Sequence, residues 1–366
     1  MSKSLLKFSS IAIQKWLIYT LFAFILLFCK INYVFAQVTI DVGVTGWDVK
    51  RPVLASACPH GCPWGELGEF VQEAMESMGY EVILCRNCNL NLGPRIVATK
   101  SYPPELTESA IRSGTTQRVN ATIDFGITSS IQLTNAYNGG VNDPGEYHFS
   151  NLRLIAHIED PSYLLVGVKK ETGITSLSQI KEKRLPVRII TRGGDVENAV
   201  LNYYGLTQKA LESWGGSLGS VGEEDAKFDV IVGGNASPSQ NPECSYWTAY
   251  SYNNNLYFLD LAEELLEQID NDVTGYERTV VRWGLLRGVD RAIPTVARSG
   301  QAIFARDDIP EQAAYDIAKA IDTHRSGLKW YIRIYTYDSQ TVWKNDDVPL
   351  HPGAERYYRE KGYIPY

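Results

Sequence analysis

The stretch VRIITRGGDVENAVLNYYGL, residues 187–206, joins an apolar run to a segment with helical spacing. Its first residues are mostly β-branched, as in a buried strand, and apolar side chains then recur three and four positions apart, as in an amphipathic helix. Gly193 and Gly194 lie at the turn, and Asp195 is expected to be the N-cap of the helix. The stretch therefore predicts one strand–turn–helix unit.

The same alternation repeats along the chain. Apolar runs typical of strands cover residues 38–44, 80–85, 121–127 and 228–234, and helical patterns follow them. This order predicts an α/β fold with mostly parallel sheets that carry helices on both faces. So many units exceed one domain of ordinary size, so we expect two lobes with one sheet each.

Two stretches are expected to carry the chain between the lobes: EDPSYLLVG, beginning at Glu159, and VARSGQAIFAR, beginning at Val296. The last segment would then return to the first lobe. We therefore expect lobe one to comprise residues 37–160 and 300–366, and lobe two residues 161–299.

The beginning of the chain has the pattern of an export signal. Lysines precede the uncharged apolar run Trp16–Phe28, and Val34 and Ala36 are small side chains at the positions that a signal peptidase reads. This predicts a signal peptide over residues 1–36, cleaved after Ala36, and a periplasmic protein. A membrane anchor is the rival interpretation, but Lys30 interrupts the run before it reaches the about 20 apolar residues that a span needs.

Charge and motifs narrow the function. The chain has 35 basic and 42 acidic residues, which argues against nucleic acid and anionic membrane surfaces as partners. It contains no P-loop and no G-x-G-x-x-G, and no two of its five histidines have a helical metal-binding spacing. The pair His351 and Glu355 is more typical of a helix start than of a site. We expect no catalytic residues, no enzyme activity, no metal site and no cofactor.

Four cysteines lie close together: Cys58, Cys62, Cys85 and Cys88. In an exported chain such cysteines form disulfides more often than zinc sites. Their spacing is loose for a zinc ribbon, and loop residues follow Cys88 where a redox C-x-x-C usually opens a helix. We expect two structural disulfides, with a metal site or a redox pair as alternatives, and Cys244 left over.

Small or polar residues follow four expected strands, at the ends where open α/β sheets bind ligands. Helix N-termini have unpaired N–H groups and a partial positive charge, so two such ends facing one crevice suit a small anion. The candidate ligand-binding residues are Trp64, Gly65, Thr128, Ser129, Ser130, Arg192, Gly193, Gly194, Asp195, Gly234 and Asn235.

Different groups would contact the anion in different ways. Arg192 offers a two-pronged donor for a carboxylate, Ser129 and Ser130 offer hydroxyl groups, Asn235 an amide and Trp64 an aromatic wall. The structural alternatives are that the serines cap a helix, the glycines only turn the chain, the tryptophan packs in the core and the arginine pairs with a nearby carboxylate.

The closing stretch VPLHPGAERYYREKGYI, residues 348–364, resembles the C-terminal signature of the TAXI group of solute-binding proteins, the receptors of one class of TRAP transporters. Residues 292–321 are similar to that family's late strand and helix, and residues 163–189 to its crossing strand and the segment after it. The resemblance covers most of the chain beyond the expected signal peptide and is most specific at the C-terminus.

This resemblance implies a two-lobed type II periplasmic binding fold that closes around a solute and presents it to a membrane permease. The implied ligand is a small carboxylate such as an amino acid or an oxo or dicarboxylic acid. Two departures lie at the expected ligand site: the cysteine-bearing loop 45–65 replaces a glycine-rich loop, and residues 192–195 replace a glycine-serine-glycine turn. The alternative functions are a periplasmic redox or metal-binding protein that uses the four cysteines, and a receptor that signals to a partner protein.

Overall fold

The computed structural model describes residues 39–56, 63–86, 93–101, 118–139, 148–222, 227–237, 246–273, 275–298, 300–331, 333–344 and 347–365. The expected signal peptide, residues 1–36, lies outside the described residues. Along the described ranges, no helix combines the length and apolar character that crossing a bilayer requires.

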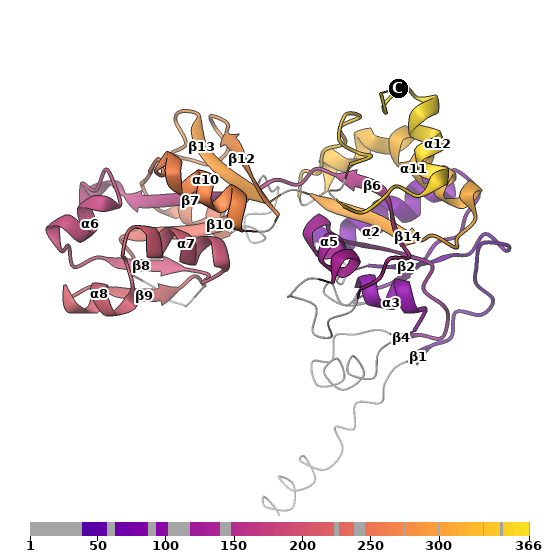
Figure 1. The fold of residues 1–366 in the computed structure, drawn as a ribbon, viewed down its shortest axis with the longest axis horizontal. Helices are drawn as coiled ribbons and strands as arrows, with labels where there is room; N and C mark the ends of the chain where they lie inside the picture. The colour runs from indigo at the N-terminus through magenta and orange to yellow at the C-terminus, as the bar shows by residue number, and fades with distance from the viewer. Residues whose placement is uncertain are drawn as a thin grey trace, which may run out of the picture.

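A five-stranded sheet forms lobe one, on the right in Figure 1. In spatial order its strands are β3 (Ile83–Cys85), β2 (Val53–Ala55), β5 (Phe125–Ser129), β14 (Gln301–Arg306) and β6 (Leu152–Ile158). The strand β2 is parallel to β3 and β5, whereas β14 is antiparallel to β5 and β6. A separate parallel pair joins β1 (Thr39–Ile40) to β4 (Arg118–Val119).

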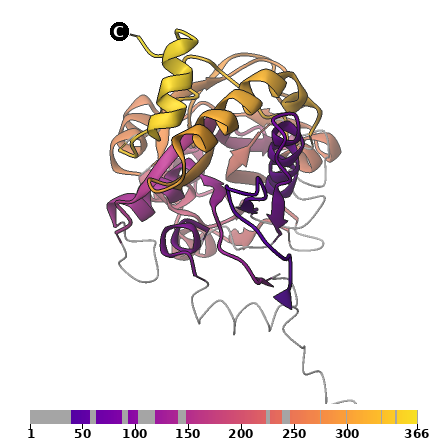
Figure 2. The same cartoon turned by 90° about the vertical axis from the view of Figure 1, so that its right-hand side faces the viewer.

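Helices cover both faces of this sheet, because successive side chains of a strand point to opposite sides. Leu54 packs in the core under α2 (Pro63–Glu76), α11 (Glu311–His324), η3 (Arg325–Trp330) and α12 (Pro352–Glu360). Its neighbours Val53 and Ala55 pack in the core under α3 (Gly93–Thr99) and α5 (Ser130–Asn138). In Figure 2 the gold α11 and the yellow α12 lie against each other on the outside of lobe one.

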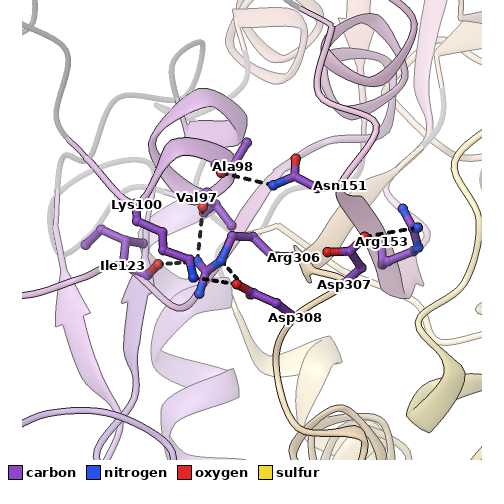
Figure 3. Close-up of polar contacts among 9 residues, drawn as sticks. All are labelled: Val97, Ala98, Lys100, Ile123, Asn151, Arg153, Arg306, Asp307 and Asp308. Carbon is purple, nitrogen blue, oxygen red and sulfur yellow. Dashed lines mark hydrogen bonds and ion pairs between the residues drawn. The ribbon is translucent and has the colours of Figure 1, made fainter.

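A buried arginine joins this sheet to neighbouring segments through hydrogen bonds and an ion pair (Figure 3). Arg306, at the end of β14, is 4% exposed, and its Nη1 donates to the carbonyl oxygens of Val97 at 3.0 Å and Ile123 at 2.8 Å. Its Nε donates to Asp308 Oδ1 at 2.8 Å, and Lys100 pairs with the same carboxylate. One guanidinium therefore joins α3, the segment before β5 and the end of β14.

A seven-stranded sheet forms lobe two. Its main path is β12 (Tyr276–Val281), β13 (Ile293–Arg298), β7 (Ser162–Lys169), β10 (Val230–Ala236), β8 (Arg188–Thr191) and β9 (Ser217–Ser220), and β11 (Leu256–Phe258) also pairs with β7. Strand β8 is parallel to β9 and β10, and the remaining pairs are antiparallel.

Two cores again lie on opposite faces of the sheet. The larger one contains side chains of α6 (Ser178–Lys183), α7 (Asp195–Tyr203), α8 (Gln208–Ser213) and α10 (Glu263–Asp272), with the short η1 (Lys170–Thr172) preceding α6. The smaller one contains Trp247, which is fully buried, from α9 (Tyr246–Asn253). The expected two-lobed α/β architecture with helices on both faces is therefore confirmed.

The sheets are mixed rather than mostly parallel, which corrects the expectation from the sequence. The chain leaves lobe one at the end of β6 and enters lobe two as β7, and it returns from β13 to β14. The strands β7 and β14 enter their lobes and therefore run away from the crevice between the lobes. Their neighbours β10 and β5 are antiparallel to them, so the carboxyl ends of β10 and β5 face the crevice.

The first strand was also misplaced by the sequence pattern. Of the described residues 39–44, only Thr39–Ile40 form a strand, and this strand pairs outside the five-stranded sheet. The first strand of the five-stranded sheet is Val53–Ala55, inside the segment that we read as a loop.

Candidate functional site

A cavity of about 480 Å³ lies between the two lobes. Lobe one contributes Ile131 of α5, and lobe two contributes the start of α7, the ends of β10, α10 and β13, and the start of β12. The lining residues are Ile131, Arg192, Gly193, Gly194, Asp195, Val196, Glu197, Asn235, Asp272, Val273, Tyr276 and Arg298. The parallel strands β8 and β10 end here, which is where open α/β sheets bind ligands.

The N-terminus of α7 opens toward this cavity. Gly194 is the N-cap, with φ −78° and ψ 174°, and among the described residues no side chain caps this end. Asp195, which we expected to be the N-cap, is instead the first residue of the helix, because the chain stays extended through Gly194. Gly193, Gly194 and Asp195 are exposed, so the first N–H groups of α7 are accessible to an anion.

The N-terminus of α5 is closed by its own residues. Ser129 is the N-cap, and its Oγ accepts from Gln132 N at 3.4 Å. Thr128 donates to Gln132 Oε1 at 2.8 Å, and Thr128, Ser129 and Ser130 are all buried. These three candidates do not line the cavity, which α5 reaches through Ile131.

The contact between the lobes depends on a glycine. Gly275, before β12, has φ +77°, and a Cβ there would lie 2.6 Å from Cδ1 of Ile131. Only glycine combines this backbone conformation with so close an approach. The side chain of Ile131 therefore rests directly on the backbone of lobe two.

Two arginines supply positive charge to the cavity. Arg192 is exposed and its guanidinium lies 5.3 Å from the ring centre of Tyr246. Arg298 is half-buried, and its Nη2 donates to Asn235 Oδ1 at 3.2 Å. Arg298 was missed by the sequence analysis because it ends an otherwise apolar strand, but its position within the expected crossing VARSGQAIFAR was a usable signal.

Negative charge lies in the same cavity. Glu197 is 4% exposed, and its Oε1 accepts from the backbone nitrogen of Gly234 at 2.9 Å. Asp195 and Asp272 are exposed at the rim. Burial raises the pKa of Tyr276, and the nearby positive charge of Arg298 offsets part of this rise. The phenol of Tyr276 is therefore a neutral hydrogen-bond donor. Glu197 resembled an ordinary polar helix position, so the sequence pattern did not indicate it.

The structure thus brings together only part of the predicted set. Arg192, Gly193, Gly194, Asp195 and Asn235 line one cavity, and Gly234 lies behind it. Gly65 is buried in the first turn of α2. The side chain of Trp64 lies outside the described part of the chain, so its proposed role stays a prediction.

Cysteine chemistry is described for one of the four candidates. Cys85, at the end of β3, is fully buried and disulfide-bonded. Cys58, Cys62 and Cys88 lie outside the described residues, so the pairing stays a prediction. Within the ranges that the structure describes, no group of three or more histidine, cysteine, aspartate or glutamate side chains could hold a metal ion.

Residues 215–219, GGSLG, match the G-x-S-x-G pattern of a nucleophile elbow. An elbow serine lies on a sharp turn between a strand and a helix. Ser217 instead begins β9, which is at the edge of its sheet. The pattern therefore lacks the structural context that its chemistry requires.

A family model described as the NMT1-like family matches residues 115–362, more than half of the chain. The chain belongs to the NMT1-like family. The matched range includes all of lobe two, both crossings and α12, and it contains every residue that lines the cavity.

Solved structures with a similar fold include a TctC solute-binding protein from Polaromonas, at 12% identity and TM-score 0.44, covering 86% of this chain and 98% of that one. The protein MatC from Rhodopseudomonas palustris with bound malate has 10% identity and TM-score 0.39, covering 86% and 97%. Another R. palustris protein, with adipate, has 11% identity and TM-score 0.41, covering 87% and 97%. At these scores the likenesses carry no argument about the ligand of this NMT1-like protein.

Proposed function

We propose that this protein is an extracytoplasmic solute-binding receptor that takes a small carboxylate into the cavity between its lobes. It would be exported to the periplasm by the signal peptide over residues 1–36 and would bind without catalysis. Lobe one, residues 37–160 and 300–366, and lobe two, residues 161–299, would move as two bodies about the crossings.

The observation that carries this proposal is the open N-terminus of α7 beside two arginines in one cavity. A carboxylate accepts two parallel hydrogen bonds from a guanidinium and further bonds from helix N–H groups. Arg192 and Arg298 come from different elements, so a carboxylate between them would be held from two directions. The volume of about 480 Å³ is suited to a small organic molecule.

Ligand binding would favour a closed arrangement of the lobes. A ligand shifts a conformational equilibrium only by the contacts that it gains in one state. Most of the lining belongs to lobe two, and Ile131 supplies the contact from lobe one. We therefore expect the ligand to bind lobe two first and to gain its last contacts when α5 approaches.

Malate, adipate and L-glutamate are suitable ligands for a first test, because malate and adipate are dicarboxylates of different length and glutamate adds an amino group. Calorimetry with each acid should show binding, and thermal unfolding should shift upward with ligand concentration. Arg192→Ala should weaken binding about tenfold. Arg184→Ala, at an exposed position on α6's C-terminal end, is the matched control and should bind as the wild type does.

The partner that we propose is the permease of a TRAP-type transporter of the TAXI class, supported by the resemblance of residues 348–364 to the signature of that group. The test is uptake of the bound acid by vesicles that contain the candidate permease, with and without the receptor. The signalling alternative would be favoured if uptake is the same with and without the receptor and the receptor captures a sensor protein only when ligand is bound.

A further inference from the structure

Asn235 lies at an irregularity in the sheet of lobe two. The pairing of β10 with β7 shifts register between Gly233 and Ala236, and Asn235 has a left-handed backbone conformation with φ +57°. A bulge of this kind turns a side chain out of the regular alternation and is common beside binding sites. A non-glycine residue takes a left-handed conformation at a cost in free energy, so the surroundings must hold it there.

Gly234, the residue that precedes Asn235, is held from two sides. The nitrogen of Gly234 donates to Glu197 on α7, and its carbonyl oxygen accepts from Trp247 Nε1 at 3.0 Å and from the hydroxyl of Tyr246, both on α9. Glu197 and Trp247 are buried. These bonds hold the peptide planes on both sides of Gly234, and they thereby fix the direction in which Asn235 leaves the backbone.

That direction leads to Arg298. Asn235 Oδ1 accepts from Arg298 Nη2 at 3.2 Å, and both side chains line the cavity. Arg298 is the last residue of β13, immediately before the chain crosses to lobe one. The amide is neutral, so it can hold one edge of the guanidinium without cancelling its positive charge, which an aspartate would do.

We propose that Asn235 is a positioning residue that acts on the ligand through Arg298 and does not contact the ligand itself. This inference rests on the proposed function, that a small carboxylate binds in this cavity. A free arginine side chain loses rotamer freedom when a ligand orders it. Ordering Arg298 before the ligand arrives lowers that cost and strengthens binding.

A double-mutant cycle tests this coupling, with malate, adipate and L-glutamate as probes in calorimetry. Asn235→Gly keeps the left-handed backbone available and removes the amide, and it should weaken binding about tenfold. Arg298→Met removes the charge, keeps an apolar stem and should weaken binding about a hundredfold. In the Arg298→Met background, Asn235→Gly should change the affinity less than about twofold, because the group through which it acts is gone.

Arg184→Gly is the matched control. Arg184 also has a left-handed conformation, φ +50°, and is exposed at the C-cap of α6 outside the cavity. Arg184→Gly removes a positive charge, as Arg298→Met does, and introduces glycine at a left-handed position, as Asn235→Gly does. The affinity for the three acids should not change.

The outcomes separate two failures. If Asn235→Gly weakens binding equally in both backgrounds, Asn235 contacts the ligand and the inference is overturned; an unchanged affinity in the wild-type background overturns it as well. If the wild type binds none of the three acids, the proposed function itself fails. In that case a measurement without ligand still tests the positioning role. The Nε–H signal of Arg298 in the NMR spectrum is assigned by its loss in Arg298→Met, and in Asn235→Gly it should move to the position of a freely rotating arginine. A signal that does not move would contradict the positioning role.

Discussion

The carboxylate of Glu197 accepts a hydrogen bond from the backbone nitrogen of Gly234, with 2.9 Å between Oε1 and the nitrogen. Glu197 lies on α7 and Gly234 lies in β10, so this bond joins two strand-to-helix junctions of lobe two. It also places a buried negative charge at the wall of the candidate ligand cavity. The carboxylate of Glu197 therefore contributes both to the stability of the fold and to the electrostatic environment of the cavity.

Two substitutions of Glu197 should separate these contributions. Glu197→Ala leaves the buried N–H of Gly234 without its acceptor and should lower the free energy of unfolding by about 1–3 kcal/mol in urea titrations. Glu197→Gln keeps an acceptor and removes the charge, so it should keep most of the stability and raise the affinity for dianionic malate several-fold. An alanine variant as stable as the wild type would contradict the structural part of this prediction.

Arg306 should be among the most sensitive positions of lobe one. Arg306→Met removes the donors to the carbonyl oxygens of Val97 and Ile123 and removes the buried charge that pairs with the half-exposed Asp308. We expect a loss of about 3 kcal/mol in the free energy of unfolding, because two buried carbonyl oxygens lose their donor. The exposed Arg184→Met should stay within about 0.5 kcal/mol of the wild type. Equal stability of the two variants would show that the Arg306 contacts are dispensable.

His351 should make the protein less stable in mild acid. Its Nδ1 accepts from Gly353 N at 3.2 Å as the N-cap of α12, and burial lowers the pKa of His351 below 6.5. The unfolded chain then binds a proton at a higher pH than the folded chain does, so the stability contribution is complete above pH 6.5 and is lost as the pH falls below it. His351→Asn keeps a capping oxygen without a titrating group.

The measurement for His351 is the urea midpoint at pH 7.5 and at pH 5. The wild type should lose more stability between these pH values than His351→Asn does. Parallel losses in the two proteins would assign the acid sensitivity to other groups.

Cys85 should resist alkylation until the protein is reduced, because it is disulfide-bonded. Denatured, non-reduced protein treated with iodoacetamide should show no label on Cys85 by peptide mass spectrometry. Reduction should then cost about 2–4 kcal/mol of stability. Label on Cys85 before reduction would reopen the metal and redox interpretations of the cysteine cluster.

The C-terminal signature shows how a recognisable sequence can have a structural role. His351 caps α12, and Gly353 lies so close to α11 that a Cβ would approach Glu311 O to 1.9 Å. The hydroxyl of Tyr357 donates to the buried Asp322 on α11 at 2.5 Å. These residues hold the last helix against lobe one, and none of them lines the cavity. The pattern therefore indicates the architecture more directly than the ligand.

Sequence alone determined the α/β class, the two lobes and the strand-to-helix junction at residues 192–195, because periodicity and turn residues report local burial and local backbone geometry. Only the tertiary structure decided which strands oppose each other, that Ser129 caps its own helix, and that Arg298 lies against Asn235, 63 residues away in the chain. The physical reason is that a periodic pattern shows which face of an element is buried. It does not show which distant side chain meets that face, and a ligand site is made of such non-local contacts.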